Sequence, residues 1–359
     1  MATREYWLQI ENHPWDVMPQ GINRMTGEEL AQGAGGLFRS LLAEALIIRR
    51  YTTDWAAPDD RPVNAWDLTE PDPAHTHGTI PGATIEAKVG DEIIVHLRNM
   101  DMRASLSEAE RTHSLHPHGV QHSPLYDGAY PLSPPDPAQG GKRGDRVPPG
   151  DSFDYRWTCP FSSAGTWLYH DHSLSHGSVR LGALGALIVR GGGERKPDLP
   201  AGPLRQPGDG PLSFAAVPEP PRQGEYILLF HELEGAGECL NGRQLLGNTP
   251  TLLAKPEGRM RFRIINFTNR PQTFHVHGHR WKQGDVWLDT EILGTAGTLT
   301  VDMLEDSSQH GGGLGEWLVM SHASHAMAGT LLVTEGGAVT LPAGVAVDMP
   351  PMDDHDHHG

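Results

Sequence analysis

The sequence is short of cysteine: its 359 residues contain only Cys159 and Cys239. Two cysteines this far apart indicate neither a disulfide framework nor a metal site of closely spaced thiolates. No apolar run reaches about 18 residues, and no basic and then apolar leader opens the chain, so no membrane-spanning or signal segment is expected. The cellular compartment stays open, because an export signal removed before this start would leave no trace. The cytoplasm is slightly favoured, since no signal segment is visible.

Positive charge is also scarce, since 28 Lys and Arg face 45 Asp and Glu and give a formal net charge of −17. A surface this acidic is expected to repel nucleic acid and anionic membranes. Glycine (43) and proline (30) are abundant, and the apolar runs are short, which favours a turn-rich all-β fold over a helical bundle. The length suffices for two cores of ordinary domain size.

Strand-like runs fall into two regions that a glycine- and proline-rich stretch separates. We expect a first domain with an N-terminal extension at residues 1–190, a linker at 191–224 and a second domain at 225–340. The tail at 341–359 contains Met and His among polar residues and is predicted to be disordered. Copper capture by that tail is the less favoured alternative.

Histidines spaced two residues apart are the main chemical signal. They form the pairs His116-Pro-His118, His170-Asp-His172 and His275-Val-His277. In a strand, residues i and i+2 project from one face about 6.5–7 Å apart, so each pair can offer two imidazoles to neighbouring metal ions. Imidazoles without carboxylates suit copper or zinc better than calcium or magnesium. The pattern therefore predicts a copper site.

An internal repeat connects these pairs. The run Gly165-Thr-Trp-Leu-Tyr-His170-Asp-His172 corresponds to Gly315-Glu-Trp-Leu-Val-Met320-Ser-His322, and His116-Pro-His118-Gly corresponds to His275-Val-His277-Gly. Order and spacing agree at several points, which indicates two copies of one β-sandwich unit. In the second copy, Met320 replaces the first histidine of the last pair.

These motifs resemble those of the multicopper oxidases, specifically the two-domain small laccases. The match covers roughly residues 80–333 and is especially close at Thr273-Phe-His-Val-His-Gly-His-Arg-Trp281. The resemblance implies two tandem cupredoxin-like Greek-key β-sandwich domains. It also implies a homotrimer, in which each trinuclear copper cluster lies between the first domain of one chain and the second domain of the next.

The resemblance also assigns ligands. His116 and His275 would hold the type-2 copper, and the type-3 coppers would take His118, His170, His172, His277 and His322. Asp171 stands where the small laccases carry an aspartate that assists proton delivery. It points away from the face of its two neighbours, so it can act only from outside the ligand shell.

Met320 stands where a type-3 histidine belongs, and two interpretations stay open. A thioether is a soft ligand that favours Cu(I), so sulfur could help to hold one copper. Alternatively, Met320 only fills space in its strand, and the third copper is weak or absent.

The type-1 copper of this family needs two histidines, a cysteine thiolate and usually a weak methionine. In the second copy of the repeat the corresponding residues are Gln272, Ser321, Ala326 and Leu331, and His325 comes one residue early. All four ligands are changed, so we expect no type-1 copper there. In the first copy they are His113, Asp171, His176 and Leu181. This His-Asp-His set could bind a harder divalent ion, but mutual hydrogen bonding is the favoured interpretation.

The remaining histidines have less specific settings. His75-Thr-His77 precedes a strand outside the ligand positions of the repeat, and a loop role is favoured. His122 could line the cluster entrance, but a surface position is favoured. His279 and His325 could support the metal ligands from outside the ligand shell, but structural roles are favoured for both.

The sequence thus predicts an atypical, laccase-like copper oxidoreductase. It would use O2 at an interdomain trinuclear-like cluster and oxidise a small phenol or amine near His322 and Met320, without a type-1 relay. The alternative is a copper-binding protein whose oxidase activity has decayed. Seven retained histidines favour catalysis, because clustered ionisable groups usually mark function. A two-domain nitrite reductase is a third option, but it also requires the missing cysteine-bound copper.

Overall fold

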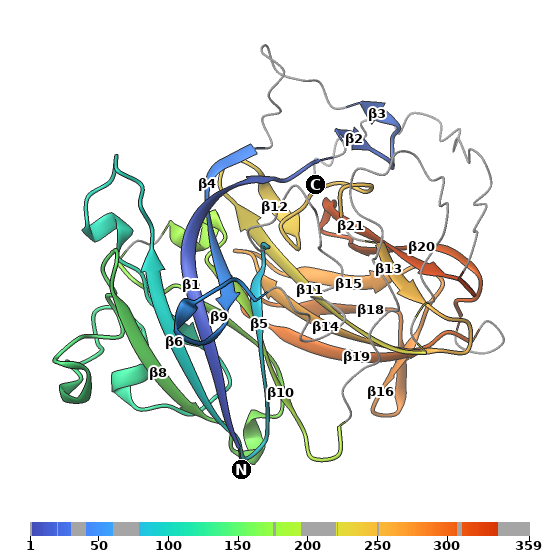
Figure 1. Ribbon diagram of the computed structural model, residues 1–359. Coiled ribbons are helices and arrows are strands. Elements are labelled where there is room, and N and C mark those ends of the chain that lie inside the picture. The colour runs from blue at the N-terminus through green and yellow to red at the C-terminus, as the bar shows by residue number, and fades with distance from the viewer. Residues whose placement is uncertain are drawn as a thin grey trace.

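The computed structural model describes residues 2–19, 21–29, 41–59, 79–174, 177–194, 220, 222–249, 251–306 and 311–336. These residues form β-strands joined by loops and short 3-10 turns (Figure 1). The 3-10 turns are η1 (Thr53–Trp55), η4 (Ala109–Arg111), η5 (Pro124–Tyr126), η6 (Pro137–Gln139), η7 (Phe161–Ser163) and η8 (Ser178–Leu181). Within these ranges, no helix has the length and hydrophobicity needed to cross a membrane.

Two sheets form the first sandwich. One has the order β4-β1-β6-β8, with β1 (Thr3–Asp16), β4 (Leu41–Tyr51), β6 (Glu92–Met100) and β8 (Ser152–Thr158). The other has the order β5-β10-β9-β7, with β5 (Gly82–Lys88), β7 (His116–Pro117), β9 (Gly165–His170) and β10 (Leu184–Arg190). The short strands β2 (Ile22–Asn23) and β3 (Glu28–Glu29) pair separately. Alternation drives the packing: in β8, Phe153, Tyr155 and Trp157 are buried between more exposed neighbours.

The second sandwich repeats this plan. Its first sheet has the order β12-β11-β14-β19, with β11 (Gln223–Leu233), β12 (Gly237–Leu240), β14 (Arg259–Phe267) and β19 (Thr298–Leu304). Its second sheet has the order β13-β21-β20-β15-β18, with β13 (Thr251–Ala254), β15 (Gln272–Val276), β18 (Thr290–Leu293), β20 (Gly315–Ser321) and β21 (Ser324–Val333). A separate hairpin joins β16 (Trp281–Gln283) to β17 (Val286–Leu288).

The strand pairings confirm the internal repeat. Strand β1 runs parallel to β6 as β11 runs parallel to β14, and β5 and β10 are parallel as β13 and β21 are. The antiparallel pairs β7–β9 and β15–β20, which carry the histidine motifs, also correspond. The domain limits at 190, 225 and 340 stay predictions. The tail at 341–359 and most of the linker at 191–224 lie outside the described residues.

The two sandwiches pack against each other through strands that are buried on both faces. Every residue of β10 is buried: Leu187 and Val189 belong to the core of the first sandwich, whereas its other face contacts the second. That contact is an apolar cluster of Leu168, Leu184, Ala186 and Ile188 with Ile227, Leu229 and Ile265. A strand that is buried on both faces does not alternate apolar and polar residues as β8 does, and β10 and β11 accordingly consist mostly of buried residues.

A buried ion network continues this interface. The Arg190 guanidinium donates to the Glu225 carboxylate at 2.8 and 3.0 Å, and to Glu86 at 2.7 Å. From the second sandwich, Arg263 lies 3.1 Å from Glu225 and donates to the Thr166 hydroxyl of β9 at 3.1 Å. Because buried charges are stable only when paired, these contacts tie the two sandwiches together.

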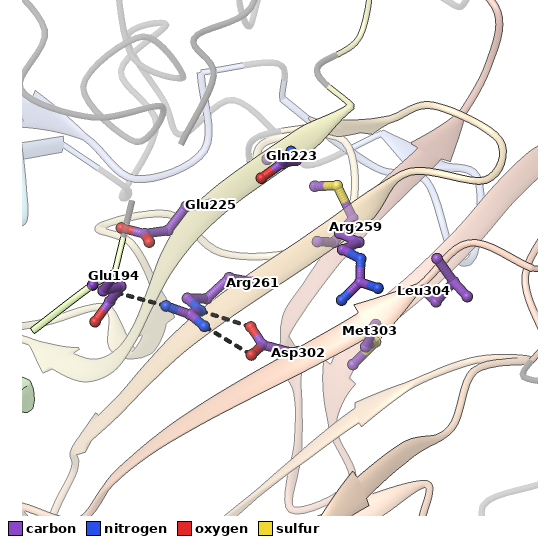
Figure 2. A pocket seen from close by; sticks show the side chains of 11 residues that line it. Glu194, Gln223, Glu225, Arg259, Arg261, Asp302, Met303 and Leu304 are labelled. Atoms are coloured by element: carbon purple, nitrogen blue, oxygen red, sulfur yellow. Dashed lines mark hydrogen bonds and ion pairs between the residues drawn. The ribbon is translucent and has the colours of Figure 1, made fainter. Parts of the chain in front are cut away.

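The network ends beside a cavity of about 520 Å³ at the start of β14. There Arg261 donates to Glu194 at 2.6 Å and to Asp302 at 2.6 and 2.8 Å (Figure 2). At the other end of β14, the ring of Phe267 lies 4.8 Å from that of His170. The nine residues of β14 span roughly 26 Å, so the cavity is remote from the histidine motifs.

Candidate metal centre

His116, His118, His170 and His172, the first half-site, lie together at one end of the first sandwich. His116 of β7 is paired in register with His170 at the end of β9. The ring centroid of His116 lies 5.1 Å from that of His118, 5.5 Å from His170 and 5.3 Å from His172. One ligand nitrogen each of His116, His118 and His170 lies within 4.8 Å of the others, a spacing that could hold a metal ion. His172 is exposed at the edge of this group.

Backbone carbonyls orient two of these rings. The Nδ1 of His116 donates to the carbonyl of Asp127 at 2.7 Å, and the Nδ1 of His170 donates to the carbonyl of Asp171 at 2.9 Å. A carbonyl can only accept, so in both rings Nδ1 carries the proton and Nε2 keeps its lone pair. The Nε2 atoms of His118 and His170 are 3.3 Å apart. The ligand nitrogens therefore point toward one another.

The surroundings keep these imidazoles neutral. Burial, helped by the neighbouring imidazoles, lowers the pKa of His118 to about 4. Burial likewise lowers the pKa of His170 to about 4, and it also lowers the pKa of His116. Only a neutral imidazole can bind a metal ion, so these rings are ready to do so at pH 7.

The second half-site consists of His275, His277 and His322. The His275 ring centroid lies 5.1 Å from that of His277 and 4.7 Å from that of His322. The Nδ1 of His275 donates to the carbonyl of Asp289 at 2.7 Å, as His116 donates to Asp127. Burial and the two neighbouring imidazoles lower the pKa of His277. His322 is exposed, so this half-site is more open than the first.

Met320 takes the place of His170 in this half-site. It is paired in register with His275, as His170 is with His116. Residues directly opposite in a sheet share a face, so the thioether lies on the face of His275. Met320 is 5% exposed, yet the adjacent apolar core includes its neighbour Val319 and not Met320.

The glycine after each histidine pair is fixed by a tryptophan of the next strand. Gly119 has φ +75, and a Cβ there would lie 1.9 Å from the Trp167 ring. Gly278 has φ +71, and a Cβ there would lie 2.4 Å from the Trp317 ring. Only glycine combines this backbone conformation with the absence of a side chain. The Gly-x-Trp and His-x-His-Gly motifs of the sequence therefore meet in the fold.

In the first sandwich, the residues that align with type-1 ligands bond one another. His113 is fully buried, with Nδ1 2.7 Å from an Asp171 oxygen and Nε2 2.9 Å from an Asp101 oxygen. Both nitrogens donate, so His113 keeps no lone pair for a metal. Burial alone would lower the pKa of His113, but the two carboxylates outweigh it and raise the pKa to about 9. The predicted hydrogen bonding is confirmed for His113 and Asp171, and His176 lies outside the described residues.

In the second sandwich, the residues that align with type-1 ligands are also engaged in hydrogen bonds or in apolar packing. The Ser321 hydroxyl donates to the Gln272 side-chain carbonyl at 2.8 Å, and the Gln272 amide donates to Glu238 at 2.7 Å. Gln272 and Ser321 are fully buried, and Leu331 is part of the apolar core. His325 is exposed.

Sequence analysis missed the residues that orient the ligands. Asp127 and Asp289 act through contacts that depend on the fold, and no local sequence pattern predicts them. His122 lies closer to the first half-site than expected, with its ring centroid 6.3 Å from that of His116 and Nε2 3.6 Å from an Asp127 oxygen. The pair His75 and His77 and the tail histidines lie outside the described residues.

The two half-sites do not meet within one chain. In the part of the chain that the structure describes, no ring contact joins a histidine of one half-site to a histidine of the other. The outward ring of His170 packs on Phe267 of the second sandwich instead. Each half-site is therefore incomplete as a multinuclear centre.

A family model described as multicopper oxidase matches residues 67–193. Human hephaestin is 30% identical over 210 residues, which cover 52% of this chain and 16% of hephaestin. Over these residues the chain is similar to multicopper oxidases. It is also similar to a probable nitrite reductase–hydroxylamine oxidoreductase fusion protein of Kuenenia stuttgartiensis, 28% identical over 273 residues that cover 73% of this chain and 28% of that one. The chain thus spans less than a third of the length of either relative.

Solved structures of copper proteins share the fold. The multicopper oxidase mgLAC superposes with a TM-score of 0.57 at 15% identity, covering 98% of this chain and 91% of that one. The copper nitrite reductase of Nitrosomonas europaea gives 0.56 at 14% identity, covering 95% and 98%. Two tandem cupredoxin-like Greek-key sandwiches, expected from the motifs, are therefore confirmed as the fold.

Proposed function

We propose that this chain is a member of the multicopper oxidase family and a copper-dependent oxidoreductase that uses O2 and oxidises a small phenol or amine. The first half-site carries the proposal. Three imidazoles face one another within 4.8 Å, two of them with Nδ1 anchored, and all three have lowered pKa values. Neutral, pre-oriented imidazoles without carboxylates fit copper.

The ligand assignment follows the two half-sites. His116 and His275 would hold a type-2-like copper, and type-3-like coppers would take His118, His170, His172, His277 and His322. Met320 would add a thioether, since it lies on the face of His275. Copper bound there would supply one-electron steps between substrate and dioxygen.

A type-1 relay is absent from this proposal. His113 has both ring nitrogens bonded to carboxylates, and Gln272 and Ser321 are bonded to each other. Neither group offers the thiolate of a blue copper site. A substrate would then reach the cluster directly, beside the exposed His322 and Met320, which restricts it to small molecules.

We further propose Asp171 as the proton-delivery residue. Its carboxylate is ionised, because the charge and bond of His113 lower its pKa despite burial. The proton it could pass therefore resides on Nδ1 of His113, 2.7 Å away. The Ser114 hydroxyl donates to Asp171 at 3.1 Å and accepts from the His172 backbone at 3.0 Å, so it links this pair to the first half-site.

The cluster is proposed to form between subunits of a homotrimer. Each half-site ends in an exposed histidine, His172 or His322. Exposed apolar side chains follow from the same elements. Leu174 (45%) comes two residues after His172, and Leu132 (78%) comes two residues after Tyr130, whose amide donates to the His172 carbonyl. Ile292 (68%) is paired with Thr273 on the strand of His275. Apolar surface beside an incomplete ligand set suits a partner that supplies the rest.

Oxygen uptake by the copper-loaded protein tests the activity. Small phenols or amines should support uptake, bulky laccase dyes should not, and His118→Asn should abolish it. Nitrite belongs in the same panel, because one relative carries nitrite reductase in its name. Copper loading without turnover of any compound would favour the alternative, a copper-binding protein that has lost its activity.

A further inference from the structure

The second half-site contains a buried ion pair that the ligand assignment leaves unused. His279 follows His277 by two residues and is 2% exposed. Its Nδ1 donates to the carbonyl of His277 at 2.7 Å, and its Nε2 donates to Glu305 at 2.8 Å. Both partners are acceptors, so both ring nitrogens carry protons and the pair is ionic. The imidazole thereby connects the backbone of a candidate ligand to the residue that follows β19.

A glycine run encloses this pair. A Cβ at Gly312 would lie 2.6 Å from the Glu305 carboxylate and 2.7 Å from Nε2 of His279. The Gly312 amide donates to the Gly278 carbonyl at 3.0 Å, within the turn that carries His277. On another side, the Trp317 ring meets the His279 ring edge-on at 5.4 Å. The enclosure holds the imidazole in one place.

The first sandwich makes the same turn without an ion pair. The amides of His118 and His277 both donate to the neighbouring strand at 2.9 Å, to Leu168 and Leu318. At the position of His279, however, the first sandwich has Val120.

Glu305 has an uncharged counterpart as well. The Cys159 amide donates to Asp91 at 3.0 Å, and the Glu305 amide donates to Gly258 at 2.9 Å, each just after the corresponding strand. Cys159 is buried at 1% and lies in the apolar core with Val120 packed against that core. The fold of a half-site therefore needs no ion pair at this position.

The ion pair occurs in the half-site that has lost a histidine. In the first half-site, His118 faces the Nε2 of His170 at 3.3 Å. In the second, His277 has Met320 in the place of that partner and no side-chain hydrogen bond among the described residues. We propose that His279 and Glu305 are positioning residues, which fix the His277 backbone and so direct its imidazole to the metal. This inference rests on the proposed copper function.

Copper binding by the full-length protein tests it. The double variant His279→Val with Glu305→Leu gives this position the apolar character of the first sandwich. Buried ion pairs can be replaced by apolar residues of similar volume with little loss of stability, so the variant should fold. We expect its affinity for the weakest-held Cu(II), measured by chelator competition, to fall about 10–100-fold. The electron paramagnetic resonance spectrum of the bound copper should change as well.

Two further variants separate positioning from packing. Glu305→Gln keeps an acceptor for Nε2 and should retain most of the affinity. Val120→Ala removes the counterpart in the first sandwich and should lower stability without changing copper affinity. If the double variant does not fold, His279→Gln decides. Its single amide nitrogen can take the place of only one of the two ring nitrogens, so the variant should give an intermediate affinity.

Three results would overturn the inference. Wild-type affinity and an unchanged spectrum in the folded double variant, or in His279→Gln, would refute positioning while leaving the copper function intact. Equal losses in Val120→Ala would reduce the effect to packing. A wild-type protein that binds no copper would refute the proposed function itself.

Discussion

At the scale of residues, the histidines divide by what their ring nitrogens face. His116 and His170 face one carbonyl each and keep a free nitrogen, whereas His113 faces a carboxylate at each nitrogen. The first environment yields a neutral ligand, and the second yields an imidazole that is protonated at neutral pH. His113 and His116 are only three residues apart, so position in the sequence does not distinguish a histidine of one kind from a histidine of the other.

His113 should make stability depend on pH. Its pKa is about 9 in the folded state and about 6.5 when unfolded. The stabilisation is therefore complete below pH 6.5 and is lost as pH rises through 9, on the order of 3 kcal/mol at most. Urea unfolding of the metal-free protein between pH 6 and 9.5 measures it. His113→Gln, which copies Gln272 of the second sandwich, should remove this slope, and an equal slope in both proteins would contradict the assignment.

Met320 should contribute to copper binding more than to packing. Met320→Leu conserves volume, so the free energy of unfolding should change by less than about 1.5 kcal/mol. Affinity for Cu(I) should fall, because the soft thioether is lost. Met303→Leu is the matched control, since Met303 is buried in the apolar core. Equal Cu(I) affinities in the two variants would make Met320 a core residue only.

At the scale of elements, each half-site is a histidine-bearing strand, a glycine turn and a tryptophan from the neighbouring strand. The motifs predicted this much, because His-x-His-Gly and Gly-x-Trp recur with the same spacing. They did not predict Asp127 and Asp289, whose carbonyls become acceptors only once distant loops pack. The Glu305 contact was likewise hidden, since 26 residues separate it from His279.

Gly119→Ala should destabilise the first sandwich strongly. The added methyl would overlap the Trp167 ring and adopt an unfavourable φ. Overpacking and strain together should cost about 2–5 kcal/mol in the free energy of unfolding. Gly90→Ala isolates the strain, because Gly90 has φ +87 and open space around it, and it should cost only about 1–2 kcal/mol. Similar losses in both variants would mean that the tryptophan contact is unimportant.

At the scale of the whole molecule, the two sandwiches are held by the apolar cluster and by the Arg190–Glu225 pair. The first half-site borders that contact through His170 and Phe267, and each half-site exposes one histidine. A second copy is therefore the proposed source of the missing ligands. Composition alone predicted neither the packing of β10 nor the exposed apolar side chains beside the half-sites.

Ile292→Glu should weaken the proposed assembly. Ile292 pairs with Thr273, on the same sheet face as His275, and is 68% exposed. A charge there would be buried without a partner at a subunit contact. Light scattering should report a smaller mass for this variant than for the wild type. Phe161→Glu is the control, because Phe161 is 85% exposed but precedes the far end of β9. A monomeric wild type would contradict the trimer.

Copper stoichiometry combined with optical and electron paramagnetic resonance spectra of the freshly loaded wild-type protein tests the central claim most directly. We predict more than one copper per chain, with a type-2-like signal, part of the copper silent through coupling, and no intense thiolate-to-copper band. A deep blue protein would contradict the absence of a type-1 site, and a protein that retains no copper would contradict the account as a whole.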